Sequence, residues 1–217
     1  MDVPSVNYKK PCGIKMSVGD KKRSRGRPKT FDRDHILSVA MQAYWQDGQA
    51  VVSLNSVCQR AGVSKPSLYK EFGGEDGLKQ AVLVDYHQMM MAPLYELLAV
   101  DQPFETVLEA LTTYILRDHQ EYGMPNGCLF VDLCQCRAQL GELTGGQVDE
   151  LRKLSIEAYA KWIDKAKVNG QFKPDIPTQT AALYIEAQIA CIMNMQRHGA
   201  AANEANAVFR LALSVFE

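Results

Sequence analysis

Apolar residues recur at helical spacing along most of the chain, and from Asp76 onward no segment shows the alternation typical of a β-strand. The first clear period runs from Asp32, a suitable N-cap, to Gly48, which ends the helix. The sequence therefore predicts an all-α fold, whose longer helices cover about 33–47, 76–98, 103–122, 127–140, 146–169, 177–198 and 202–216.

Proline and glycine mark the predicted breaks between these helices. Pro103 suits a first helical turn, and Gly123, Gly170 and Gly199 suit helix ends. Pro93 falls inside the predicted 76–98 helix, where its missing N–H and its ring predict a bend or a break near residues 89–94.

Two short helices follow the first long one and meet at a glycine. Ser53 caps the first, and Ser64 caps the second, which runs through Phe72. Gly62 lies in the turn between them, where a positive φ is allowed. A capped helix, a tight turn and a second capped helix form the arrangement of a helix-turn-helix. The residues that would pack this pair together are Cys58, Val63 and Leu68.

The second short helix has a polar and basic surface of the size that enters the major groove of DNA. Pro66 lies in its first turn, and the other residues left exposed are Ser64, Lys65, Ser67, Tyr69 and Lys70. The pair therefore predicts a double-stranded DNA partner.

The balance of charge also differs between the part of the chain that holds the two short helices and the part that follows. Residues 1–80 hold 14 lysines and arginines against 8 acidic residues, whereas residues 81–217 hold 10 against 17. A basic end of this kind indicates a polyanionic partner. Residues 1–30 hold nine basic residues and no apolar period, so they are predicted to be a disordered basic arm. We expect the DNA-binding domain at 31–75 and a second helical domain at 76–217.

Composition excludes several other classes of protein. No run approaches the roughly 18 apolar residues of a membrane span, and the first thirty residues lack the apolar core of a secretory signal, so we expect a cytoplasmic protein with no membrane partner. The scattered histidines and the absence of a CxxC pair predict neither a metal site nor a cofactor. We expect reduced thiols at Cys12, Cys58, Cys128, Cys134, Cys136 and Cys191.

Three features of the first 86 residues follow one known signature: GRPKTFDRDHIL, then SLNSVCQRAGVSKPSLYKEFGG, then a long helix that begins near Gly77. Together they resemble the N-terminal signature of the TetR family of bacterial regulators over roughly residues 26–86. The core AGVSKPSLYKEF is specific enough that chance is a poor explanation. The resemblance implies a ligand-responsive transcriptional regulator, more often a repressor, that binds a palindromic operator as a homodimer.

The same resemblance implies which residues face DNA. Tyr69 and the capped helix ends would hold phosphates, and Lys65 and Pro66 would lie nearest the bases. The implied set is Ser53, Ser64, Lys65, Pro66, Ser67, Tyr69 and Lys70. Three positions depart from the family pattern, namely Gln49, Val52 and Glu75, and a carboxylate at Glu75 would repel DNA.

The basic arm contains Arg25-Gly26-Arg27-Pro28, followed by Lys29. This segment resembles the core of an AT-hook, in which arginines flank a glycine thin enough for a narrow minor groove. Two interpretations stay open: insertion of Arg25, Arg27 and Lys29 into the groove, or a nonspecific electrostatic tether.

For residues 81–217 the family likeness implies a small-molecule cavity and a dimer interface made by the last two helices. Candidates for the cavity are aromatic, sulfur-bearing or ionisable: Met90, Tyr95, Tyr114, His119, Cys128, Phe130, Cys134, Trp162 and Met193. Candidates for the dimer interface are apolar: Ala182, Ile185, Ile189, Ile192, Phe209 and Leu213. Both sets also suit an ordinary core within one chain.

Three cysteines within nine positions (Cys128, Cys134 and Cys136) add a second hypothesis, that the effector is an electrophile or oxidant acting on a thiol. Two rival functions also remain at this stage. One is an architectural DNA-binding protein without an effector, and the other is an enzyme that uses Cys128 or His119. The sequence has no GxSxG, no HExxH and no glycine-rich phosphate loop, which argues against the enzyme.

Overall fold

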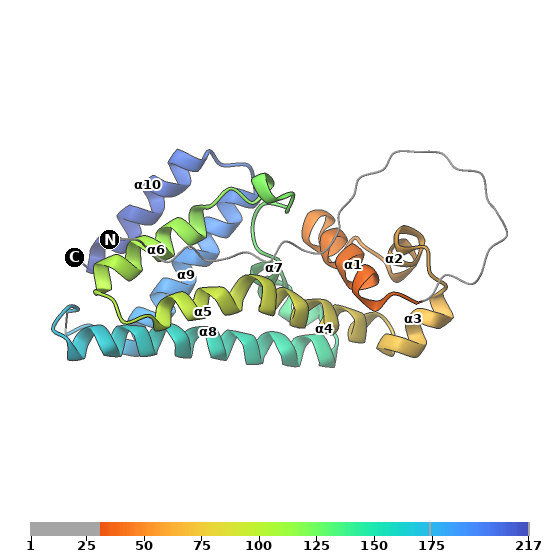
Figure 1. The fold of residues 1–217 in the computed structure, drawn as a ribbon, viewed down its shortest axis with the longest axis horizontal. Coiled ribbons are helices and arrows are strands. Elements are labelled where there is room, and N and C mark those ends of the chain that lie inside the picture. The colour runs from red at the N-terminus through yellow and green to blue at the C-terminus, as the bar shows by residue number, and fades with distance from the viewer. Residues whose placement is uncertain (1–30, 174, 217) are drawn as a thin grey trace.

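The computed structural model describes residues 31–173 and 175–216, and Figure 1 shows their arrangement. Arg25, Arg27 and Lys29 of the predicted arm lie outside the described residues. The α-helices are α1 (Arg33–Asp47), α2 (Leu54–Ala61), α3 (Lys65–Phe72), α4 (Glu75–Tyr86), α5 (Ala92–Ala99), α6 (Phe104–Leu116), α7 (Leu129–Gln135), α8 (Glu142–Val168), α9 (Thr178–Arg197) and α10 (Ala202–Leu213). The described residues contain no strand, so the all-α prediction is confirmed.

The molecule is elongated, with α1, α2 and α3 at one end (Figure 1). Helix α8 runs along the rest of the molecule beside α4 and α5, and α6, α9 and α10 complete the other end. Helix α4 packs against α1 and α3 and also against α8, so it joins the two ends.

The N-terminal caps form where the sequence predicts them. Asp32 accepts a hydrogen bond from the backbone N–H of His35 at 3.1 Å, and Ser53 accepts one from Ser56 at 3.2 Å. Gly62 is left-handed, with φ of 68°, and closes the turn between α2 and α3.

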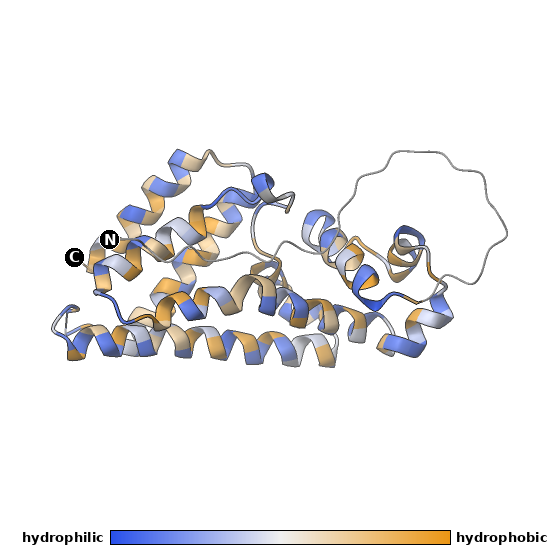
Figure 2. Ribbon diagram, in the orientation of Figure 1, coloured by the Kyte–Doolittle hydropathy of each residue, from blue (hydrophilic) through white to orange (hydrophobic). Residues whose placement is uncertain are grey.

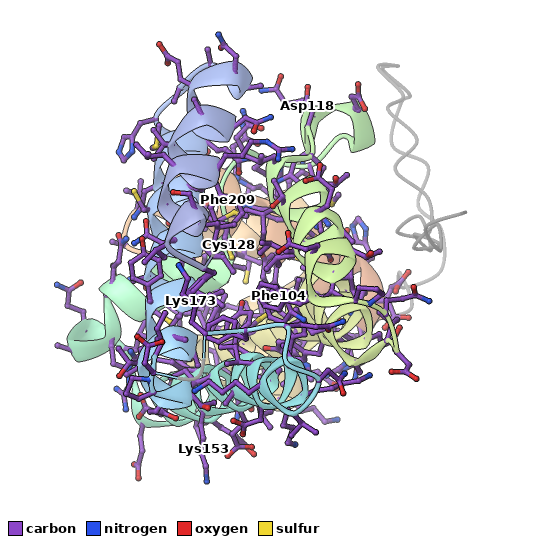
Figure 3. All side chains as sticks on the ribbon, turned by 90° about the vertical axis from the view of Figure 1, so that its left-hand side faces the viewer. Phe104, Asp118, Cys128, Lys153, Lys173 and Phe209 are labelled. Carbon is purple, nitrogen blue, oxygen red and sulfur yellow. The ribbon has the colours of Figure 1, made fainter. Side chains whose placement is uncertain are left out.

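Two apolar clusters form the core of the described residues. One joins α1–α4 to α7 and the first half of α8, and the other joins α5, α6, α9 and α10 to the second half of α8. In Figure 2 the helices carry both hydrophobic and hydrophilic residues, as amphipathic helices around shared cores should. Viewed along the molecule in Figure 3, Phe104, Cys128 and Phe209 lie among the helices, whereas Lys153 projects outward.

The second cluster corrects the predicted dimer interface. All six candidates are buried within a single chain, with exposed fractions from 0% to 8%: Ala182, Ile185, Ile189, Ile192, Phe209 and Leu213. They face α6 and α8 or each other, because α9 and α10 use their most apolar stripes to close the core of their own chain.

Pro93 splits the predicted 76–98 helix as expected. A π-helical turn, His87–Met91, separates α4 from α5, and Pro93 lies in the first turn of α5, where no N–H is needed. The hydroxyl of Tyr114 donates a hydrogen bond to the carbonyl of Met90 at 2.6 Å. The α6 helix therefore supplies a partner for a carbonyl at the irregular turn.

Two predicted helices are shorter than expected. The 103–122 helix stops at Leu116, because Asp118 accepts the N–H of Gln120 at 2.8 Å and begins a separate 3-10 turn. The 127–140 helix is α7 alone, followed by a 3-10 turn over Arg137–Gln139.

Helix α8 begins at Glu142, four residues before the start at 146 that the sequence predicts. The carboxylate of Asp76 in α4 accepts the N–H groups of Leu143 and Thr144 at 2.9 and 3.1 Å and the hydroxyl of Thr144 at 2.6 Å. A side chain 67 residues away in sequence therefore caps α8. A Cβ at Gly141 would lie 2.3 Å from Cγ of Asp76, so the glycine allows this approach.

We expect Asp76→Asn to lower the free energy of unfolding by roughly 1 to 2 kcal/mol at pH 7, because an amide cannot accept both N–H groups. Burial opposes ionisation of Asp76, but its hydrogen bonds from Thr144 and Leu143 outweigh burial and lower its pKa. The ionised carboxylate of Asp76 therefore makes its full contribution to the free energy of unfolding above the unfolded pKa of about 3.9. This contribution is lost as pH falls through the folded pKa. Urea unfolding at neutral and acidic pH measures it.

The matched control is Asp118→Asn, which alters a cap on an exposed turn and should change the free energy of unfolding by less than about 0.5 kcal/mol. Equal effects of the two substitutions would contradict the role of Asp76 as a cap between α4 and α8.

Candidate nucleic-acid interface and ligand cavity

The helix-turn-helix has a buried side and an exposed side. Cys58 and Leu68 are buried between the helices, and Val63 is partly buried against the same cluster. All seven described residues predicted to face DNA are exposed: Ser53, Ser64, Lys65, Pro66, Ser67, Tyr69 and Lys70. The fold brings these residues together on the outer side of α3 and at the start of α2.

The two serine caps serve the local structure first. Ser64 accepts the N–H of Ser67 at 3.3 Å, and their hydroxyls lie 2.8 Å apart. Ser53 caps α2 in the same way. Both helix N-termini remain exposed, and helix N-termini suit phosphate groups.

Tyr69 has a defined position although 48% of its surface is exposed. The Nζ of Lys65 lies 5.9 Å from the centroid of its ring, and the ring also lies close to Gly74. A Cβ at Gly74, where φ is +127°, would lie 3.2 Å from the ring. Lys65 and Tyr69 therefore present an ammonium and a hydroxyl beside each other.

Two of the three positions that depart from the family pattern, Glu75 and Gln49, are bound by Lys79. Its Nζ lies 2.8 Å from a carboxylate oxygen of Glu75 and donates a hydrogen bond to the amide oxygen of Gln49 at 3.0 Å. Gln49 is buried, so this bond satisfies a polar group in the interior. Lys79 was not predicted from the sequence, although a lysine four residues after a glutamate on a helix is a common pairing.

A cavity of about 510 Å³ lies in the second part of the molecule. It lies among α4–α9, and its walls are mainly apolar. Eight of the nine predicted residues line it: Met90, Tyr95, Tyr114, His119, Cys128, Phe130, Cys134 and Met193. Trp162 does not line the cavity and is a correction. Its ring stacks on Phe104, with centroids 4.7 Å apart, because α6 and α8 bury both rings in the second cluster.

Polar groups in the cavity wall mostly bind one another. The hydroxyl of Tyr86 donates to Sγ of Cys128 at 3.1 Å, and the hydroxyls of Tyr95 and Ser155 lie 2.7 Å apart. Burial raises the pKa of Tyr95 to about 12, so this phenol stays protonated.

The cavity wall touches the DNA-binding end through Trp45 of α1. The Trp45 ring packs edge-on against Tyr86 at 5.0 Å and against His119 at 5.7 Å between centroids. Both partners line the cavity. Sequence analysis placed Trp45 only in the helical period of 33–47, because its neighbours come from distant parts of the chain.

Arg197 at the end of α9 makes a second connection to α1. It donates one hydrogen bond to the carbonyl of Trp45 at 2.8 Å and another to Asp132 of α7 at 3.0 Å, with which it also forms an ion pair. Burial lowers the pKa of Arg197 from its ordinary value. Gly127 allows the approach, since a Cβ there would lie 2.9 Å from the Cβ of Arg197.

The thiols in the cavity wall are protonated at neutral pH. Burial raises the pKa of Cys128, and it raises the pKa of Cys134 to about 12. Hydrogen bonds from Tyr86 and from α7 backbone groups lower the pKa of Cys128 but do not outweigh burial. A thiol held in this form is a weak nucleophile.

Residues 31–173 and 175–216 contain no cluster of three His, Cys, Asp or Glu side chains that could hold a metal ion. In the same part of the chain, every helix is too short or too polar to span a bilayer.

Comparison with known proteins identifies the N-terminal part. Residues 36–82 match the sequence model of the family described as bacterial regulatory proteins, tetR family. The chain is 35% identical over 114 residues to the HTH-type transcriptional repressor ComR of Escherichia coli K12, covering 52% of this chain and 54% of that protein. It is 32% identical over 114 residues to the repressor BdcR of the same strain, covering 52% and 58%. The match thus spans about half the length of these curated relatives.

The whole fold also has solved counterparts. A cysteine mutant of the TetR family transcriptional regulator CifR, complexed with 26-bp double-strand operator DNA, superposes with a TM-score of 0.75 at 21% identity. The superposition covers 88% of this chain and all of that one. The fold and the turn between α2 and α3 define a helical protein of the helix-turn-helix class. The N-terminal domain, over residues 36–82, belongs to the tetR family of bacterial regulatory proteins.

We expect iodoacetamide at neutral pH to alkylate Cys128 and Cys134 at least about a hundredfold more slowly in the folded protein than in urea, because few thiolates form in the buried cavity wall. Mass spectrometry of the modified peptides over time measures both rates. The unfolded protein provides the reference for each thiol. Fast alkylation of either cysteine in the folded protein would favour the hypothesis of a thiol-reactive effector.

Proposed function

We propose that the protein is a ligand-responsive transcriptional regulator, a repressor that binds a palindromic operator as a homodimer and leaves it when a small molecule occupies the cavity. The observation that carries this proposal is the contact of Trp45 with two cavity-lining residues, Tyr86 and His119. The repressors ComR and BdcR, which this chain resembles over half their length, favour repression over activation.

In this proposal α3 enters the major groove. Lys65 and Pro66 lie nearest the bases, while Tyr69, Ser53 and Ser64 bind phosphates at or near the helix N-termini. Glu75 stays compatible with DNA because Lys79 pairs with its carboxylate. The roles of Arg25, Arg27 and Lys29 in the arm remain predictions.

Two exposed apolar stripes support the homodimer. Val208 and Leu211 are exposed on α10, where 76% of Leu211 is accessible, and Val215 is exposed in the 3-10 turn that follows it. On α9 the exposed apolar positions are Leu183, Ala187 and Cys191. A second copy of the chain that covers these stripes forms a symmetric pair, as reading a palindrome requires. These residues replace the six buried candidates in the proposed interface.

Coupling follows from the contacts at Trp45. A ligand that displaces Tyr86 or His119 changes the packing of α1, which the hydrogen bond from Arg197 to the carbonyl of Trp45 ties to α9. A ligand that binds one arrangement more tightly than the other shifts the equilibrium between them.

The cavity favours this function over its rivals. An architectural protein without an effector has no use for a cavity of about 510 Å³ that reaches the DNA-binding end. An enzyme that used Cys128 would need a reactive thiolate, and burial raises the pKa of this thiol. The proposed effector therefore binds without a covalent bond.

We expect Lys65→Gln to weaken operator binding by roughly tenfold or more, because it removes a cation next to the bases and phosphates. The operator is first selected from genomic fragments retained by the protein at about 0.15 M salt, where nonspecific attraction is partly screened. Fluorescence anisotropy then measures the affinity across a salt series.

Lys153→Gln is the matched control, since Lys153 projects outward from α8 (Figure 3) and should leave operator affinity unchanged. Uniform retention of all fragments would favour the architectural rival. Equal affinities of the two variants for a selected operator would contradict the proposed role of α3.

We expect Leu211→Asp to convert the dimer to a monomer, because a carboxylate in a covered apolar stripe loses its hydration. Sedimentation velocity over a dilution series measures the assembly. Val168→Asp is the control, since Val168 is 87% exposed at the end of α8 and is not one of the proposed interface residues. A wild-type monomer at all concentrations, or a dimer insensitive to Leu211→Asp, would contradict this interface.

A further inference from the structure

Most hydroxyl groups in the cavity wall give their protons to other groups of the protein. The hydroxyl of Tyr86 donates a hydrogen bond to Sγ of Cys128 at 3.1 Å. The hydroxyl of Tyr114 donates one to the carbonyl of Met90 at 2.6 Å. Neither proton is left for a ligand, because a hydroxyl carries only one.

The pair of Tyr95 and Ser155 follows the same pattern. Their hydroxyl oxygens lie 2.7 Å apart, and the oxygen of Ser155 lies 3.0 Å from the carbonyl oxygen of Leu151. Because a carbonyl oxygen can only accept, Ser155 donates its single proton to Leu151. Tyr95 must then donate to Ser155, so both of these protons are also bound within the protein.

Tyr159 is the exception. It lies on the face of α8 that also turns Val148, Arg152 and Ser155 toward the cavity, at intervals of three or four residues. Only 4% of Tyr159 is exposed, and its hydroxyl makes no hydrogen bond among the described residues. Burial is the main cause that raises the pKa of Tyr159, so the phenol keeps its proton at pH 7. The wall therefore holds one hydroxyl donor whose proton has no acceptor in the described residues.

His119 also has an atom without a partner, but a ligand cannot reach it directly. Its Nε2 makes no hydrogen bond among the described residues and is itself covered by other atoms of the protein. The hydroxyl of Tyr159 is not covered in this way. A ligand would therefore contact Nε2 of His119 only after the ring had moved, whereas Tyr159 offers its donor in the present arrangement.

The charged side chains of the wall have partners within the protein. Arg137 donates two hydrogen bonds to Asp149 at 2.8 and 2.7 Å, and Arg152 donates two to Glu186 at 2.9 and 3.0 Å. The guanidinium carbon of Arg117 lies 3.7 Å from the centroid of a tyrosine ring. A charged ligand would lose its hydration without meeting a charge that lacks a partner, so the wall favours an uncharged molecule.

The rest of the wall is suited to an apolar body. Met90, Leu94, Ile115, Ile189 and Met193 all line the cavity, whose volume of about 510 Å³ suits a small organic molecule. A ligand without a hydrogen-bond acceptor would cover the hydroxyl of Tyr159 and leave its donor unsatisfied, which is costly in a buried site. A ligand with an acceptor removes this cost.

We propose that the cavity binds an uncharged, largely apolar organic molecule that carries a carbonyl-type oxygen, and that this oxygen accepts a hydrogen bond from Tyr159. This inference rests on the proposed function, which supplies a ligand for the cavity. It adds the chemical class of that ligand and the residue that recognises its polar group.

The test compares acetophenone with α-methylstyrene, in which a methylene group replaces the carbonyl oxygen. Each displaces N-phenyl-1-naphthylamine, an uncharged fluorescent reporter, from the full-length protein, and the affinity of the reporter is measured separately for each variant. We expect Tyr159→Phe to weaken acetophenone by about threefold to tenfold, because one neutral hydrogen bond is lost. The same substitution should leave α-methylstyrene within about twofold of its wild-type affinity, because this probe accepts no hydrogen bond.

Tyr95→Phe is the matched control, since it removes a hydroxyl from the same wall whose proton Ser155 already binds. It should change the affinities of the two probes by the same factor, so that their ratio stays within about twofold of the wild-type ratio. Thermal melting establishes that each variant is folded. Tyr159→Phe should melt no lower than the wild type, because it breaks no hydrogen bond of the ligand-free protein.

The outcomes separate this inference from the proposed function. Equal effects of Tyr159→Phe on the two probes overturn the carbonyl acceptor while leaving a ligand cavity, and an equal change of the ratio in Tyr95→Phe overturns the assignment to Tyr159. Benzoate, which carries a carboxylate in place of the acetyl group, should compete more weakly than acetophenone, and tighter binding overturns the uncharged class. If neither the reporter nor any probe binds, both the inference and the effector part of the proposed function fail.

Discussion

The structure depends on the way Arg197 joins three separate helices. Carbonyls in the last turn of a helix have no partner within the helix, and Trp45 carries one of these at the end of α1. Arg197 satisfies this carbonyl and pairs with Asp132, so the ends of α1, α7 and α9 meet at a single guanidinium. Removing one partner of this largely buried ion pair would leave the other charge uncompensated. Arg197 thus adds a polar contact between α1 and the second part of the molecule, beside the packing of α4 against both.

Around this junction, α1 packs directly behind the wall of the cavity. Trp45 belongs to α1 by sequence, yet its ring contacts two residues of the cavity. Cys128 packs against both apolar clusters and receives the hydroxyl of Tyr86. The two halves of the molecule are therefore one packed body, and a change in the volume of the cavity reaches α1 through direct van der Waals contact.

Capping residues near each helix end predicted the starts of the first helices well. The predictions failed where residues far apart in the sequence determine the structure. The caps Asp32, Ser53 and Ser64 act within three residues, so their helices begin as predicted. The start of α8 was wrong because its cap is Asp76, and the apolar stripe of α9 was assigned to a dimer because periodicity cannot tell which partner buries it. Eight cavity residues could be named from their chemistry, whereas the contacts of Trp45 with Tyr86 and His119 are visible only once the fold brings distant parts of the chain together.

The π-helical turn at His87–Met91 sets the rotation between the two halves of the long helical segment. A π turn holds one residue more than the α-helical repeat, which rotates everything after it by about 100° relative to an unbroken helix. Tyr86 precedes this turn and Tyr95 follows it, and both line the cavity. A deletion of a single residue within the turn would remove this extra rotation and carry Tyr95 and Leu94 away from the lining, while Pro93 would still interrupt the helix. The shape of the cavity thus depends on the number of residues in this turn as well as on their identity.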